Sequence, residues 1–204
     1  MFVTKIVPLT KTRFQIYLDD KPAFVLYEGE LQKYGLIPET DISDAIVQQI
    51  KEEVLLKRAK LRALHLLNDM DRTEEGLLQK LLQGGYPNDV SEAAVSYVKS
   101  FGYIDDKRYA EQYIRSRMLK KSKRELYVAL VGKGLRNSVI EEALENCFSD
   151  MCEQETIMQL LKKKNYDNET ADDKTKKKMF DYLLRKGFRY EDIRQALQVS
   201  STNA

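Results

Sequence analysis

The sequence predicts a mainly α-helical fold, in which three tandem three-helix repeats form an elongated array after a small antiparallel β segment. Two observations predict this architecture. A glycine recurs at Gly85, Gly134 and Gly187 with similar neighbours each time. The spacing of hydrophobic residues also changes near Asp41, from the two-residue period of a strand to the roughly 3.6-residue period of a helix.

Each of the three glycines stands at a fixed distance from the same kinds of residue. Just before the glycines stand the aliphatic pairs Leu81-Leu82, Leu130-Val131 and Leu183-Leu184. Nine and ten residues after the glycines stand the pairs Ala94-Val95, Ala143-Leu144 and Ala196-Leu197. The glycines are about 49 and 53 residues apart, which is typical of tandem helical repeats. Because glycine adopts a positive φ without a Cβ clash, we interpret them as helix terminators. Such arrays present long exposed faces, which favours a binding protein over an enzyme with a pocket.

The first 40 residues have the pattern of strands. Residues 3–7 and 13–18 alternate between apolar and polar side chains, and residues 23–27 follow a turn at residues 19–22. We expect about three antiparallel strands that pack on the first helices, since so small a sheet does not stand alone. A short helix over residues 30–34 should end at Gly35.

Three helical units follow the strand segment. In the first, helices are predicted over about residues 41–70, 73–83 and 89–101. In the second, Asp105 and Asp106 begin a helix, Ser122 begins one that runs to Gly134, and Ser138 begins the third, since both serines open Ser-x-x-Glu capping boxes. In the third, helices are predicted over residues 153–163, 174–186 and 190–198. The resulting domain boundaries are 1–40 for the β segment and 41–104, 105–149 and 150–204 for the repeats.

The composition indicates a soluble protein of a reducing compartment. The chain has 204 residues, 34 Lys and Arg, 32 Asp and Glu, and a net charge of +2. No apolar run reaches the roughly 18 residues of a membrane span, and the first residues do not form a signal peptide. Cys147 and Cys152 give no disulfide framework, so we expect a cytoplasmic protein without membrane contact. With the single His65, the cysteines are expected to be buried or half-buried packing residues on helices.

The sequence holds no recognisable catalytic or metal-binding set. It has one histidine, no Ser-His-Asp arrangement and no glycine-rich phosphate loop, so we expect no enzyme activity, cofactor or metal. The pair Asp105-Asp106 could suggest a metal site. Helix capping explains it better, because the carboxylates suit the positive end of a helix and no other acidic cluster has ligand spacing.

The second unit carries a band of positive charge. Residues 111–136 hold eight cations against two acids, and six of these cations fall between Arg115 and Arg124 with no acid among them. Tyr113 and Tyr127 flank the band and could stack on bases or belong to the core. Three interpretations remain open: a nucleic-acid site, a site for an acidic protein surface, or a solvated face. The candidate binding residues are Arg108, Arg115, Arg117, Lys120, Lys121, Lys123, Arg124, Lys133 and Arg136.

A second lysine-rich run follows Asp172 and Asp173, and its charge is nearly cancelled locally. Its members are Lys174, Lys176, Lys177 and Lys178. We interpret this run as a solvated helix face rather than a binding site.

Three segments of the chain together resemble the RecX family of bacterial regulatory proteins. Residues 102–110, with Tyr113, Ile114, Arg115 and Arg117 after them, resemble the family's Gly-Tyr-hydrophobic-Asp-Asp-x-Arg-aromatic-Ala motif. Residues 72–81 resemble the segment upstream, although Thr73 replaces a serine and Gly76 displaces the family's glutamate. Residues 121–134 resemble the basic stretch, which in the family often has Gly and Pro near its start. The resemblance covers about residues 42–200, and the N-terminal strands look like the extension of Gram-positive members.

The resemblance implies a function that composition alone does not give. Similar proteins bind the recombinase RecA and modulate its filaments on single-stranded DNA, most often by limiting extension or promoting disassembly, in recombination, DNA repair and the SOS response. The chain is thus expected to act as a monomer on a RecA filament, and contact with single-stranded DNA is left open. The alternative is a stand-alone nucleic-acid-binding helical repeat protein.

Overall fold

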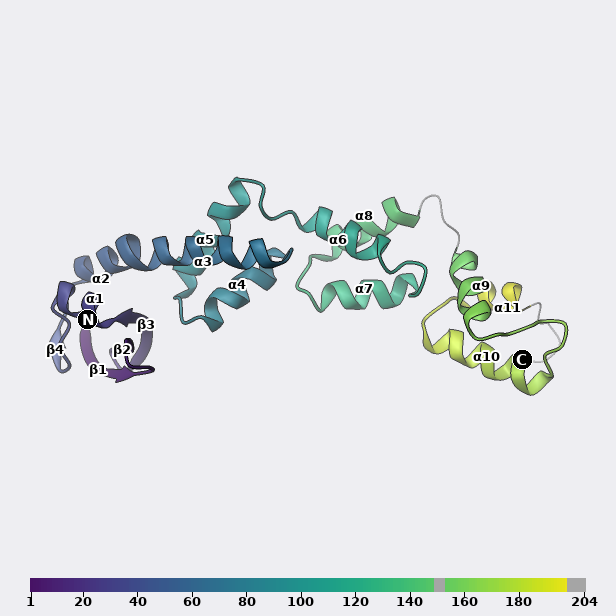
Figure 1. Cartoon of the computed structure of the whole chain (residues 1–204), viewed down its shortest axis with the longest axis horizontal. Coiled ribbons are helices and arrows are strands. Elements are labelled where there is room, and N and C mark those ends of the chain that lie inside the picture. The colour runs from purple at the N-terminus through teal and green to yellow at the C-terminus, as the bar shows by residue number, and fades with distance from the viewer. Residues whose placement is uncertain (149–152, 198–204) are drawn as a thin grey trace. The chain divides into compact units, whose positions relative to one another are not determined.

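The computed structural model describes residues 1–148 and 153–197. The chain divides into two compact units, Met1–Asp105 and Asp106–Ala204. Figure 1 shows strands and helices in the first unit, and helices without strands in the described part of the second. The fold is therefore the predicted one, mainly α with a small N-terminal sheet.

The N-terminal sheet has four antiparallel strands, one more than the sequence predicts. The strands are β1 (Phe2–Pro8), β2 (Arg13–Leu18), β3 (Lys21–Tyr27) and β4 (Thr40–Asp41), in the order β3-β2-β1-β4. Asp19 and Asp20 adopt φ angles of 47° and 64° in the β2–β3 turn. The unpredicted strand β4 is two residues long and pairs Val3 with Thr40. A strand this short leaves no alternation of side chains to detect in the sequence.

The helices of the first unit start directly after the sheet. Helix α1 (Glu28–Tyr34) ends at Gly35, and α2 (Asp44–Ile50) continues through the π-helical turn η1 (Lys51–Leu55) into α3 (Leu56–Asp69). The helical backbone at Ile50 and Leu55 shows that these pieces form one long helix, as predicted. Helices α4 (Glu74–Gln83) and α5 (Asn88–Ser100) complete the first three-helix unit.

The second compact unit contains the other two repeats. Helices α6 (Asp106–Arg115), α7 (Lys123–Val131) and α8 (Asn137–Phe148) form one, and α9 (Glu153–Lys163), α10 (Asp173–Arg185) and α11 (Tyr190–Ala196) form the other. The expected boundary at residues 149–150 lies outside the described residues. The capping box expected at Ser138 is wrong: α8 begins one residue earlier, and the Arg136 carbonyl accepts the amides of Val139 and Ile140.

Three hydrophobic clusters form the core, and the same repeat positions are buried in each. Leu81, Leu130 and Leu183, each four residues before its glycine, are 0% exposed. The first cluster also contains sheet residues, among them Val3 and Phe24. The sheet therefore shares one core with the first helical unit, whereas the second and third clusters are built from the helices and connecting turns of the second unit.

The recurring glycines end the second helix of each repeat with the same hydrogen bonds. Gly85, Gly134 and Gly187 have φ angles of 85°, 79° and 87°. Each glycine amide donates to the carbonyl three residues earlier, and the next residue's amide donates to the carbonyl of the buried leucine. This is the Schellman arrangement, which requires a left-handed residue after the helix.

Two of these glycines also lie close to another element. A Cβ at Gly85 would come within 2.9 Å of Cγ2 of Val25 in β3, and one at Gly187 within 3.0 Å of Cδ of Arg124 in α7. The glycine turn of repeat one thus packs on the sheet, and that of repeat three packs on repeat two. The sheet thus contacts the glycine turn of repeat one as repeat two contacts the glycine turn of repeat three.

Candidate functional site

The predicted band of cations lies where α6 ends and α7 begins. Arg115 is the last residue of α6, and the next five residues form turns before α7. Arg115, Arg117, Lys120 and Arg124 are exposed, while Lys121 and Lys123 are half-buried. The structure therefore presents most of the charge between Arg115 and Arg124 to solvent.

The N-terminal half of the band is associated with aromatic rings. The Arg117 guanidinium lies 4.0 Å from the centre of the Tyr113 ring, and Lys133 Nζ lies 5.3 Å from the same ring. Tyr113 stacks on Tyr109 with ring centres 6.4 Å apart and an interplanar angle of 16°. Both tyrosines also pack against the core of repeat two. The rings therefore act as a platform that holds cations at the surface.

One exposed ion pair and one hydrogen bond to a neighbouring serine engage the two arginines. Arg115 Nη2 lies 3.9 Å from Glu111 Oε2, with the arginine side chain 64% exposed, and Arg117 Nη1 donates to the Ser116 hydroxyl at 2.5 Å. An exposed ion pair of this length contributes little to stability. Both guanidinium groups thus keep donors for an anionic partner.

The C-terminal half of the band lies at a junction between repeats two and three. The Lys123 amide donates to Glu153 Oε1 at 3.2 Å, and its ammonium lies 4.9 Å from the Phe148 ring centre. The methylene carbons of Arg124 approach the Gly187 turn. Lys123 and Arg124 therefore contribute to the fold as well as to the charged surface.

Buried hydroxyl groups complete this junction. Ser122, 1% exposed, accepts the Glu125 amide at 3.2 Å as the α7 N-cap and donates to the Lys186 carbonyl at 2.5 Å. The Lys186 ammonium pairs with Glu125 Oε1 at 3.3 Å. Thr156, also 1% exposed, donates to the Met118 carbonyl at 2.9 Å. The capping box of Ser122 was predicted from the sequence. The hydrogen bonds from Ser122 to Lys186 and from Thr156 to Met118 were not, because they join residues too far apart in the chain for any local signal.

The remaining predicted residues lie away from this junction. Arg108 is exposed on α6, and Arg136 is exposed immediately before α8. Asp105 directly precedes α6, whereas Asp106 is its first helical residue, so Asp105 alone stands at the N-cap position. A carboxylate at either position suits the positive helix terminus.

The cysteine and histidine expectations have mixed outcomes. Cys147 is buried in repeat two, and burial raises the pKa of its thiol, so little thiolate forms at neutral pH. Cys152 lies outside the described residues. The expectation for His65 is wrong: its side chain is exposed, because the buried stripe of α3 runs through Ala59, Ala63 and Leu66.

The described residues offer neither a metal site nor a membrane-spanning helix. Over residues 1–148 and 153–197, no three His, Cys, Asp or Glu side chains are grouped so that they could hold a metal ion. Among the same residues, no helix is long and apolar enough to cross a membrane.

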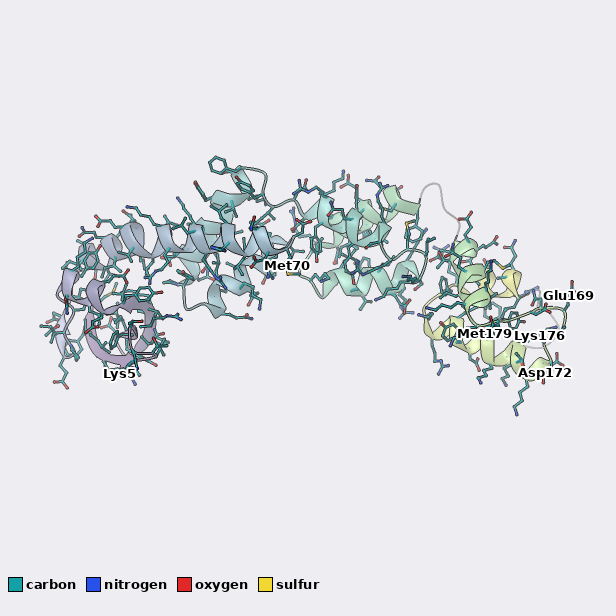
Figure 2. The ribbon with its side chains drawn as sticks, viewed as in Figure 1. Lys5, Met70, Glu169, Asp172, Lys176 and Met179 are labelled. Carbon is teal, nitrogen blue, oxygen red and sulfur yellow. The ribbon has the colours of Figure 1, made fainter. Side chains whose placement is uncertain are left out.

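Figure 2 shows the side chains of both units and labels Asp172 and Lys176 at the start of α10. Asp172 is the N-cap of this helix and accepts the Thr175 amide at 2.9 Å. Hydrogen bonds from the Thr175 side chain and its amide hold the pKa of Asp172 below its usual value. The acid therefore caps α10, and the lysine run that follows it lies on the helix.

Family models match the three repeats in order. The first, second and third three-helix domains of RecX match residues 59–97, 105–144 and 152–197. Regulatory protein RecX of Clostridium perfringens (strain 13 / Type A) is 30% identical over 187 residues, which cover 88% of this chain and 85% of the relative. Regulatory protein RecX of Clostridium acetobutylicum is 28% identical over 192 residues, covering 92% and 90%.

Solved structures have the same fold. A crystal structure of a regulatory protein RecX aligns with a TM-score of 0.63 at 24% identity, covering 98% of this chain and 99% of the other. The crystal structure of RecX from Lactobacillus salivarius aligns with a TM-score of 0.59 at 24% identity, covering 70% and 94%. The three ordered domain matches and the similarity over nearly the whole chain show that this protein belongs to the RecX family of regulatory proteins.

Proposed function

We propose that this protein binds the recombinase RecA and modulates, chiefly by inhibition, the activity of RecA filaments on single-stranded DNA. It would act in the cytoplasm as a monomer, in recombination, DNA repair and the SOS response, without catalysis of its own. The observation that carries the proposal is the match of three consecutive helical domains to the three RecX domains in the same order.

The repeat construction is physically suited to this role. Each repeat has its own hydrophobic cluster and its own exposed faces. A chain of such modules can contact several neighbouring subunits of a filament, and each further contact then forms at a high effective concentration. Several weak contacts would thus add to a firm attachment without a deep pocket.

The proposal is tested by RecA ATPase activity on single-stranded DNA, measured with and without this protein. We expect the activity to change, in the direction of inhibition, at protein concentrations far below the concentration of DNA sites. A RecA activity that stays constant up to an equimolar amount of this protein would refute the proposal.

A second candidate function is direct binding of nucleic acid by the exposed cations of repeat two. The observation that favours it is the set of guanidinium groups at the surface beside stacked tyrosines. Phosphate contacts make the affinity depend on salt, with a slope of roughly 0.7 per contact on single strands.

Charge reversal separates the second candidate from the first. Replacing Arg115, Arg117, Lys120 and Lys121 by Glu should flatten the log affinity versus log salt slope for single-stranded DNA by about 3 if all four contact phosphate. The control replaces Lys162, Lys163, Lys174 and Arg189 by Glu, which changes the net charge equally on repeat three. If both variants lose the same DNA affinity, the effect is one of net charge and the band is no specific site.

A further inference from the structure

The second helices of repeats two and three carry the same pair of exposed residues in the same register. Arg124 and Lys177 stand ten residues before Gly134 and Gly187, and Val131 and Leu184 stand three residues before them. Residues seven apart on a helix share one face, so each cation and its aliphatic partner lie on one stripe. We call the four residues the cation–aliphatic stripe.

All members of the stripe face solvent, although their neighbours are core residues. Val131 and Leu184 are 44% and 47% exposed, whereas Leu130 and Leu183 beside them are 0% exposed. Arg124 and Lys177 are exposed as well. The aliphatic residues are therefore not held at these positions by packing within the chain.

Contacts at the junction place the two halves of the stripe one after the other. The Ser122 hydroxyl donates to the Lys186 carbonyl, which brings the C-terminal end of α10 to the N-terminal end of α7. The side chain of Arg124 lies against the turn at Gly187. Figure 1 shows α7 and α10 neighbouring each other in the second unit. Leu184 also lines a shallow surface depression with Lys178, Asp181 and Arg185.

We infer that the cation–aliphatic stripe docks on a repeating protein surface, in which successive identical subunits each offer a carboxylate beside an apolar recess. The inference rests on the proposed function, since a RecA filament is such a surface, and it names the face that docks. Two equivalent pairs on one compact unit can engage two equivalent subunits, and the second contact then forms at a high effective concentration.

The aliphatic members of the stripe favour a protein over a nucleic acid. Phosphates would pair with Arg124 and Lys177, but they offer no apolar contact to Val131 and Leu184. A protein surface that is both acidic and apolar satisfies the two cations and the two aliphatic side chains together.

The test replaces both aliphatic residues of the stripe in the full-length chain, as Val131→Gln with Leu184→Gln. Glutamine has good helix propensity, so we expect an unchanged melting temperature. The affinity for RecA filaments on single-stranded DNA should fall by about tenfold or more, because two aliphatic contacts are lost. Each single variant should lose less. The matched control is Leu61→Gln with Met158→Gln, at residues 67% and 56% exposed outside the stripe, and it should bind like wild type.

A second variant tests the charge of the stripe without touching its apolar groups. Lys177→Glu should weaken filament binding several-fold, whereas Lys162→Glu on α9 should not.

If wild type inhibits RecA and both stripe variants inhibit it equally well, the inference is overturned while the proposed function stands. If the stripe variants lose affinity for naked DNA to the same degree as for filaments, the occupant is nucleic acid and the inference is equally overturned. If wild type does not act on RecA at all, the proposed function itself fails.

Discussion

Single residues in this chain have two kinds of role, and only one of them is visible in the sequence. A left-handed glycine after a helix is local, so the positive φ angles of Gly85 and Gly187 follow from their position. The close approach of Gly85 to Val25 joins residues from different elements, and the same is true of Gly187 and Arg124. Sequence position alone does not give such contacts.

Replacement of Gly85 by alanine should therefore cost more than replacement of Gly102. Both glycines have positive φ, so each substitution carries roughly 1–2 kcal/mol of backbone strain. A Cβ at Gly85 also meets Val25 at 2.9 Å, whereas one at Gly102 has nothing within 4 Å. Urea unfolding measures both free energies. Equal losses would mean that β3 yields to the new methyl group at no cost.

The stability of repeat three should depend on pH through Asp172. Hydrogen bonds from Thr175 lower the pKa of Asp172 in the folded state. The ionised carboxylate therefore stabilises the fold fully above the unfolded-state pKa of about 3.9, and this stabilisation is lost as pH falls through the folded-state pKa. The melting temperature of wild type should thus fall more between pH 6 and pH 3 than that of Asp172→Asn, in which the amide caps α10 without a charge. Identical pH profiles would show that this acid does not titrate with folding.

At the scale of elements, the sequence predicts the helices well and their mutual contacts poorly. Helix α9 has the expected bounds, and α4, α7 and α10 end within three residues of the expected positions, because apolar period and caps are local signals. The junction of Ser122, Thr156 and Lys186 is not local: its hydrogen bonds connect residues 38 and 64 positions apart. The cations of the band were predicted from their sequence density, but the packing of Lys123 and Arg124 at this junction was not.

Ser122 should contribute more to the free energy of unfolding than an ordinary helix cap does. Ser122→Ala removes the α7 cap, which costs about 1 kcal/mol, and also leaves the half-buried Lys186 carbonyl without its hydroxyl partner, which costs about 1 kcal/mol more. The control Ser43→Ala removes the exposed N-cap of α2, which accepts the Ile46 amide. Chemical denaturation compares the two. Equal losses would show that the bond to Lys186 adds nothing to stability.

The β segment belongs to the first repeat energetically. The sequence places it as a separate segment, residues 1–40, with helical repeat one from residue 41. The structure puts Val3 and Phe24 in one cluster with Leu77 and Leu81, so we propose that residues 1–104 fold together. Deletion of residues 1–40 should therefore abolish the cooperative unfolding of the first unit. Thermal unfolding monitored by circular dichroism measures this. A deletion variant that keeps a sharp transition for that unit would contradict this.

At the scale of the whole molecule, the sequence predicts three helical units because each repeats the same core positions. Leu81, Leu130 and Leu183 are all fully buried. The exposed positions of the repeats are less alike than the buried ones, and we propose that they select the partner. Repeat two carries the band of cations, and repeats two and three share the cation–aliphatic stripe, which emerges only when exposure is known at each position.

The central claim is that this protein recognises a RecA filament rather than DNA alone. The most direct measurement compares its equilibrium affinity for RecA filaments on single-stranded DNA with its affinity for the same DNA without RecA, at physiological salt. We expect the filament to be bound at least about tenfold more tightly, a difference of about 1.4 kcal/mol, because protein contacts add to any phosphate contacts. Equal affinity for filament and naked DNA would contradict the claim and leave nucleic-acid binding as the function.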